Sequence, residues 1–248
     1  MARSFVPTLD DSQLAAFRAD GFVALDRIAD EAEIAWLREV YARILDDAKA
    51  LRLRYTGETP AGNAAEITQI FLPERQCPEL LDTGYIRHAQ RLAASLLGVA
   101  PEHVSYGGVM MIYKPPGAGL EAPFHQDEAY WEFPGERLSH SVSCWMPLDE
   151  VTVESGCMQF VPGSHALEVM KHRRKAPTEP LELDEPYDVS SAEPCPLAPG
   201  GATFHHCRTV HGTGPNTSPH PRRAFTTIFH GPPGVRDVRL SRPWLGLP

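Results

Sequence analysis

Apolar residues in the first hundred positions recur mainly at the three-to-four-residue spacing of amphipathic helices. The predicted elements are a helix opening at Asp10 and Asp11 and ending at Gly21, a strand over 22–25, a helix capped by Asp30, and a helix over about Tyr85–Leu97 stopped by Gly98. Residues 1–103 are therefore expected to be mostly helical.

From Val104 onward the pattern changes to short extended runs separated by Pro and Gly. The candidate strands are Gly108–Tyr113, Phe124–Asp127, Ser141–Met146, Met158–Val161, Ala202–Phe204, Thr209–His211 and Ala224–His230. Several short strands at this spacing are typical of a sandwich or jelly roll. The charged, proline-rich segment 167–199 has no clear periodicity, so it is predicted to be a long insertion between strands, and such loops in compact enzymes are often lids.

A possible metal site lies within these strands. His125 and Asp127 are two residues apart on an extended segment, so their side chains are expected on the same face. A distant histidine can complete a set of two imidazoles and one carboxylate, which is the facial triad of non-haem Fe(II) oxygenases. His211 is preferred for this position over His205 and His206, because the turn Gly-Thr-Gly-Pro-Asn follows it.

Arginines downstream of His211 add a second feature. A guanidinium can hold a dicarboxylate co-substrate through two parallel hydrogen bonds. Arg222 and Arg223 are adjacent on a predicted strand, so they point to opposite faces and only one of them can enter the interior.

Three ordered blocks carry a family resemblance. They read MIYKPPGAGLEAPFHQDEAYW (Met111 to Trp131), SCWMPLDEVTVESGCMQFVPGSH (Ser143 to His165) and TVHGTGPNTSPHPRRAF (Thr209 to Phe225). The chain resembles the phytanoyl-CoA dioxygenase family of Fe(II)/2-oxoglutarate oxygenases over roughly its whole length. The resemblance implies one domain over 1–248, mainly β with flanking helices: an N-terminal helical portion over 1–103, then a double-stranded β-helix (jelly roll, cupin-like) core over 104–248.

The resemblance also assigns site residues. It implies that His125, Asp127 and His211 bind Fe(II), and that Arg222 anchors 2-oxoglutarate, with Arg223 as the alternative. Further candidates near the metal or the co-substrate are Thr213, Trp145, Met110, Gln126 and Gln69, the last reaching the site from the helical portion.

The implied reaction converts 2-oxoglutarate and dioxygen to succinate and carbon dioxide while a small-molecule metabolite is hydroxylated, with natural-product metabolism as the expected context. Desaturation, cyclisation or epimerisation, and an acyl-CoA substrate, remain alternatives within the family. Asp127 argues against halogenation, because halogenating relatives lack this carboxylate. A catalytically silent jelly-roll binding module and a cupin-like metalloenzyme without a keto acid are the rival classes.

Composition narrows the partners. The formal net charge of −9 argues against a broad nucleic-acid interface. No apolar stretch reaches membrane-spanning length and the N-terminus lacks a signal-peptide hydrophobic region, so a cytoplasmic protein is expected. The five cysteines form no CxxC pair, which disfavours a disulfide framework or a thiolate zinc site. The oligomeric state is left open.

Overall fold

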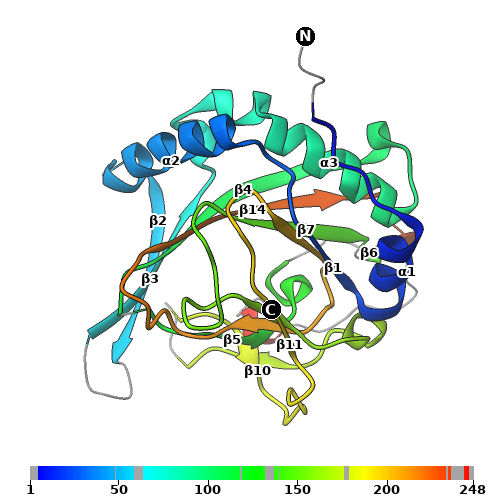
Figure 1. The fold of residues 1–248 in the computed structure, drawn as a ribbon. Coiled ribbons are helices and arrows are strands. Elements are labelled where there is room, and N and C mark those ends of the chain that lie inside the picture. The colour runs from blue at the N-terminus through cyan, green and yellow to red at the C-terminus, as the bar shows by residue number, and fades with distance from the viewer. Residues whose placement is uncertain are drawn as a thin grey trace.

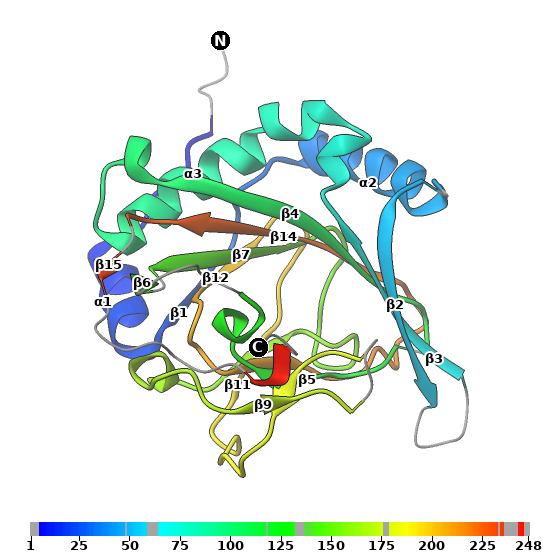
Figure 2. The ribbon, with the colours of Figure 1, turned by 180° about the vertical axis from the view of Figure 1, so that it is seen from behind.

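The structure is a computed structural model that describes residues 5–47, 49–58, 64–117, 119–131, 137–138, 140–175, 179–232, 234–235 and 243–245. A seven-stranded and a four-stranded antiparallel sheet lie on opposite sides of an interior space (Figure 1). Helices α2 and α3 cross the outer face of the larger sheet, and the view from behind shows the same order of layers (Figure 2). The chain is thus mainly β with flanking helices around a jelly roll, as expected.

The three helices begin and end close to the residues that the sequence indicated. They are α1 (Asp11–Asp20), α2 (Glu31–Asp46) and α3 (Gly84–Leu97). The carboxylates of Asp10 and Asp30 accept hydrogen bonds from backbone N–H groups in the first turns of α1 and α2. Gly21 and Gly98 end α1 and α3 at φ values of 83° and 68°, which glycine adopts without strain.

The larger sheet contains strands from both halves of the chain. In spatial order they are β1 (Phe22–Leu25), β12 (Ala202–His206), β7 (Ser141–Pro147), β14 (Arg222–His230), β4 (Ser105–Lys114), β3 (Ala64–Phe71) and β2 (Leu51–Glu58). The prediction that residues 1–103 are mostly helical is wrong for β2 and β3, which extend the sheet beyond β4. The alternation of Leu51, Leu53 and Tyr55 with polar residues was the available signal.

The smaller sheet comes from the second half of the chain. Its spatial order is β11 (Glu193–Cys195), β8 (Met158–Phe160), β13 (His211–Thr213) and β5 (Ala122–His125). Because β11 pairs with β8, the predicted insertion 167–199 is wrong at its C-terminal end, which belongs to this sheet. Within the segment, β9 (His172–Arg173) pairs with β10 (Glu182–Leu183), and elsewhere β6 (Arg137–Leu138) pairs with β15 (Gly234–Val235).

Two groups of buried apolar side chains stabilise the layers. The larger group lies between the helices and the larger sheet, where the rings of Tyr41 and Phe225 meet edge to face at 5.5 Å. The smaller group lies between the sheets, where Phe22 stacks on Phe160 at 4.7 Å beside Trp145. Among the described residues, none of the helices combines the length and the apolar character needed to span a bilayer.

Candidate active site

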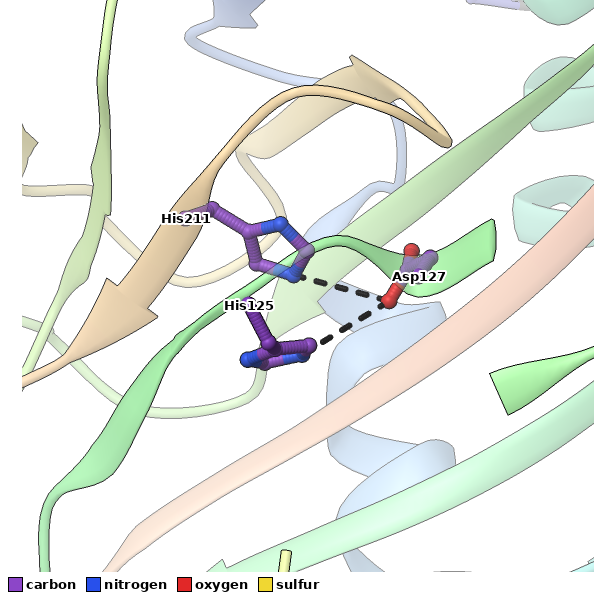
Figure 3. A group of neighbouring side chains, drawn as sticks. All are labelled: His125, Asp127 and His211. Carbon is purple, nitrogen blue, oxygen red and sulfur yellow. Dashed lines mark ion pairs between the residues drawn. The ribbon is translucent and has the colours of Figure 1, made fainter. Parts of the chain in front are cut away.

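His125, Asp127 and His211 meet in the space between the sheets (Figure 3). His125 ends β5 and is the register partner of His211, the first residue of β13, so strand pairing brings the two imidazoles together. Gln126 is extended, with φ −117° and ψ 132°, and Asp127 therefore follows on the same side of the chain as His125. The predicted strands are shifted here: β5 stops before Asp127, and His211 begins its strand instead of ending it.

The separations within this cluster suit a single metal ion. Asp127 Oδ1 lies 3.8 Å from Nε2 of His125 and 3.5 Å from Nε2 of His211. All three ligand atoms lie within 4.8 Å of one another. This spacing is close to that of atoms sharing one ion with metal–ligand bonds of about 2.1 Å.

The two imidazoles are held with their Nε2 atoms toward Oδ1 of Asp127 (Figure 3). Nδ1 of His125 lies 2.7 Å from the Pro123 carbonyl, and Nδ1 of His211 lies 2.8 Å from the Thr209 carbonyl. Because a carbonyl only accepts, each Nδ1 carries the hydrogen and each Nε2 is free to bind a metal. Burial lowers the pKa of His125, and burial with the neighbouring imidazoles of His125 and His205 lowers the pKa of His211 well below its ordinary value.

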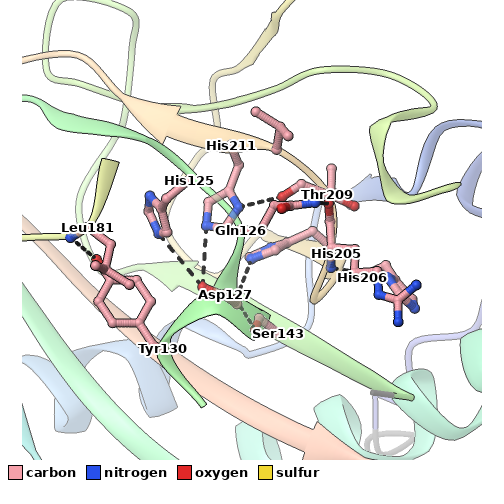
Figure 4. A network of polar contacts seen from close by, with 12 residues as sticks. His125, Gln126, Asp127, Tyr130, Ser143, Leu181, His205, His206, Thr209 and His211 are labelled. Atoms are coloured by element: carbon pink, nitrogen blue, oxygen red, sulfur yellow. Dashed lines mark hydrogen bonds and ion pairs between the residues drawn. The ribbon is translucent and has the colours of Figure 1, made fainter. Parts of the chain in front are cut away.

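Asp127 supplies the negative charge. Burial by itself raises the pKa of this carboxyl, but the imidazoles of His211 and His205, the His205 hydrogen bond and the imidazole of His125 bring the pKa well below its ordinary value. Ser143 Oγ donates to Asp127 Oδ2 over 2.6 Å, and Nε2 of His205 lies 3.1 Å from the same oxygen (Figure 4). An ionised carboxylate and two neutral imidazoles form the donor set that suits non-haem Fe(II).

A buried cation lies in the same cavity. Arg222 is 1% exposed, and its guanidinium carbon lies 5.3 Å from the ring centre of Trp145. Burial lowers the pKa of Arg222 to about 10, so it stays charged at neutral pH. Its Nε and Nη1 atoms have no hydrogen-bond partner among the described residues. Buried charges are normally paired, so these donors indicate a binding site for an anion.

A second basic group, Lys114, lies beside Arg222. The two residues are register partners on β4 and β14, so their side chains leave the sheet on the same face. The Lys114 side chain is fully buried, and its Nζ donates to Thr213 Oγ1 over 2.7 Å and to the Gly214 carbonyl over 2.5 Å. Burial, together with the positive charge of Arg222, lowers the pKa of Lys114 well below its ordinary value.

The cavity encloses about 630 Å³, including its opening to solvent. Away from the charged groups, its described lining includes Tyr55, Ile67, Gln69, Met110, Ile112, Pro180 and Thr226. The Tyr55 hydroxyl donates to Gln69 Oε1 over 3.0 Å, which fixes the orientation of that amide. This part of the cavity is neutral and largely apolar.

Most residues selected from the sequence line this one cavity. They are His125, Asp127, His211, Arg222, Thr213, Trp145, Met110 and Gln69. Gln69, however, projects from strand β3 and not from a helix. Arg223 points to the opposite face of β14, as expected, and its guanidinium donates to both carboxylate oxygens of Asp149.

Gln126 was selected wrongly. Its side chain donates to the Arg208 carbonyl over 2.9 Å and accepts from the Met170 backbone N–H over 2.8 Å, and it does not line the cavity. The alternation that places His125 and Asp127 on one side of the chain places Gln126 on the other. The correction was therefore available from the sequence.

Lys114, Ser143 and Tyr55 were not anticipated, although strand periodicity could have found the first two. Lys114 follows Met110 and Ile112 at every second position of β4, and all three line the cavity. Ser143 lies two residues before Trp145 on β7 in the same way. Tyr55 lies on a strand that the sequence analysis did not predict.

Comparison with known proteins identifies the family of the chain. The phytanoyl-CoA dioxygenase (PhyH) family model matches residues 17–224. The chain is 31% identical over 229 residues to methylphosphonate hydroxylase of Gimesia maris, covering 90% of this chain and 81% of that protein. The structure of EvdO2 from Micromonospora carbonacea var. aurantiaca, complexed with 2-oxoglutarate, is 35% identical with a TM-score of 0.82, covering 97% of this chain and 98% of that one. The carbocyclase SnoK from nogalamycin biosynthesis, at 24% identity, shares the fold with a TM-score of 0.71 over 97% of this chain and 92% of that one.

A jelly roll with two imidazoles, a carboxylate and a buried guanidinium in one cavity has the features of a non-haem iron oxygenase. The chain belongs to the phytanoyl-CoA dioxygenase family. It is an Fe(II)/2-oxoglutarate-dependent dioxygenase, with dioxygen as the second co-substrate.

Proposed function

We propose that the protein hydroxylates a small-molecule metabolite and converts 2-oxoglutarate to succinate and carbon dioxide in the same cycle. His125, Asp127 and His211 hold Fe(II), which when bound supplies the redox chemistry that activates dioxygen. The observation that carries the proposal is the shared cavity of Arg222 and the three-residue cluster. A dicarboxylate can bind there with one end at each.

The charges in the cavity set the orientation of 2-oxoglutarate. Nε and Nη1 of Arg222 have no partner among the described residues, so the guanidinium can donate charge-assisted hydrogen bonds to the far carboxylate. Lys114 adds a second cation when it is protonated, and the Thr213 hydroxyl adds a further donor. The keto acid end is then directed to the metal position. The Trp145 ring packs against the guanidinium of Arg222.

The neutral remainder of the cavity is the proposed site of the primary substrate. Ile67, Met110 and Ile112 offer apolar contacts, and the Tyr55–Gln69 pair offers hydrogen bonds without charge. A small, largely uncharged metabolite fits this lining. The name of methylphosphonate hydroxylase gives a small-molecule substrate, which supports a small molecule here as well. SnoK belongs to nogalamycin biosynthesis, and a role in secondary metabolism is proposed by analogy. Hydroxylation is proposed ahead of desaturation, cyclisation and epimerisation as the simplest outcome.

An acyl-CoA substrate is less well supported. The basic run 171–175 could attract the phosphates of an acyl-CoA, but three of its five residues already form ion pairs. Arg173 and Lys175 pair with Glu182, Arg173 also pairs with Asp184, and Lys171 pairs with Glu185.

We propose that the chain acts as one domain in the cytoplasm without nucleic-acid or membrane partners, in agreement with its net charge and its five free cysteines.

The test is succinate formation by the purified enzyme. We expect succinate to form from 2-oxoglutarate only with Fe(II) and dioxygen, and to form faster when a library of small metabolites includes the substrate. His125→Ala, Asp127→Ala and His211→Ala should each abolish it, whereas Arg223→Lys should not. Binding of 2-oxoglutarate without succinate under any condition would indicate the silent binding module instead.

A further inference from the structure

A third histidine, His205, lies against the proposed metal ligands without being one of them. It is 1% exposed, and its ring centre lies 4.4 Å from that of His211 and 5.1 Å from that of Phe160. The only described hydrogen bond of its ring joins Nε2 to Oδ2 of Asp127. Its position suggests a role that acts through Asp127.

The two oxygens of Asp127 have different neighbours. Oδ1 lies near Nε2 of both His125 and His211, at 3.8 Å and 3.5 Å. Oδ2 instead accepts from Ser143 Oγ at 2.6 Å and lies 3.1 Å from Nε2 of His205 (Figure 4). One oxygen therefore points toward the metal position, and the other is used by the surrounding protein.

The chemistry of these contacts fixes the hydrogen positions. An ionised carboxylate only accepts, so both Ser143 and His205 must donate to Oδ2. His205 then carries a hydrogen on Nε2, while its buried Nδ1 has no partner among the described residues. His205 is thus a hydrogen-bond donor to Asp127, with its Nε2 lone pair unavailable to a metal.

We propose that Ser143 and His205 together hold Oδ2 of Asp127, so that Asp127 offers only Oδ1 to the metal. This inference rests on the proposed metal site. Its consequence is the number of free coordination positions. An ion held by two imidazoles and a single carboxylate oxygen would leave coordination positions for the keto acid and for dioxygen. A second carboxylate oxygen would compete for one of them.

The variants separate the hydrogen bond from packing. His205→Phe keeps an aromatic ring beside Phe160 but removes the N–H, and Ser143→Ala removes a single hydroxyl. His205→Gln retains an N–H donor that can reach the carboxylate. His206→Gln is the matched control, because His206 is the next residue of β12 and its Nδ1 accepts from the Arg208 backbone N–H, away from the cluster.

The readout is binding of Co(II) to apoprotein, followed by anaerobic binding of 2-oxoglutarate to the Co(II) form. Loss of a hydrogen-bond partner of a metal ligand typically weakens metal binding about 10-fold to 100-fold. In the double variant His205→Phe/Ser143→Ala we expect Co(II) affinity to fall by this factor. The Co(II) absorption spectrum should also change, because the coordination number changes. The 2-oxoglutarate affinity should also fall, because the keto acid must displace a carboxylate oxygen. The single variant His205→Gln should keep the Co(II) affinity, the Co(II) spectrum and the 2-oxoglutarate affinity of the unchanged protein.

Unchanged Co(II) affinity, spectrum and 2-oxoglutarate affinity in the double variant would overturn the inference. If His205→Phe does not fold, Ser143→Ala alone and its comparison with Ser143→Thr carry the same test. Failure of the proposed metal site is distinguishable, because then Asp127→Ala would bind Co(II) as tightly as the unchanged protein.

Discussion

Nζ of Lys114 lies 2.7 Å from Oγ1 of Thr213, a contact that links β4 of the larger sheet to β13 of the smaller one. Because the ammonium donates to the hydroxyl oxygen, the hydroxyl hydrogen of Thr213 is free to point elsewhere in the cavity. Lys114 and Thr213 line the cavity together with Arg222, whose Nε and Nη1 have no partner among the described residues. The three residues together form the proposed site for the far carboxylate of 2-oxoglutarate.

Lys114→Met should weaken binding of 2-oxoglutarate by about 10-fold to 100-fold, because a hydrogen bond to a charged group contributes about 1.5–3 kcal/mol. Methionine preserves most of the buried volume. Calorimetry on the metal-loaded enzyme without dioxygen measures the affinity, and the exposed Lys175→Met is the control. Equal affinities for the two variants would exclude Lys114 from the anchor.

Binding of 2-oxoglutarate should take up a proton. In the free enzyme, burial and then the charge of Arg222 lower the pKa of Lys114 well below its ordinary value. A bound carboxylate favours the charged form and raises this pKa. The affinity should therefore fall as the pH rises from the lowered pKa of the free enzyme toward the raised pKa of the complex. Calorimetry in buffers of different ionisation enthalpy measures the uptake, and Lys114→Met should remove it.

Arg222→Lys should raise the apparent KM for 2-oxoglutarate at least 10-fold, since a lysine cannot reproduce a bidentate guanidinium contact. Arg223→Lys should leave it unchanged, because Arg223 pairs with Asp149 on the other face of β14. Titration of succinate formation against 2-oxoglutarate compares the two variants. The reverse pattern would show that the anchor is assigned to the wrong residue.

Charge reversal at Arg173 and Arg174 should affect stability more than catalysis. Arg173 pairs with Glu182 and Asp184, and the guanidinium of Arg174 lies 5.6 Å from the ring centre of Tyr130. Exposed ion pairs contribute little to stability, so only a small fall in the thermal unfolding midpoint is expected. Kinetics at two salt concentrations provide the test. A salt-sensitive loss of turnover with intact 2-oxoglutarate affinity would instead support a lid that attracts an anionic substrate.

The sequence by itself determined the features that depend on local geometry. Asp10, Asp30, Gly21 and Gly98 marked helix ends because capping and positive φ are properties of single residues and their neighbours. Strand alternation placed Arg222 and Arg223 on opposite faces for the same reason, and the family resemblance selected Arg222 as the inward residue. The same alternation places Gln126 on the opposite side of the chain from His125 and Asp127.

Tertiary structure alone decided which distant residues meet. Pairing of β13 with β5 brings His211 to His125, and pairing of β14 with β4 places Lys114 beside Arg222. The proposed role of His205 depends on the position of β12, which brings Nε2 of His205 to Oδ2 of Asp127. No local sequence pattern specifies this contact. Strand register is fixed by contacts between segments far apart in the chain, so periodicity can give the face of a residue but not its neighbour across the sheet.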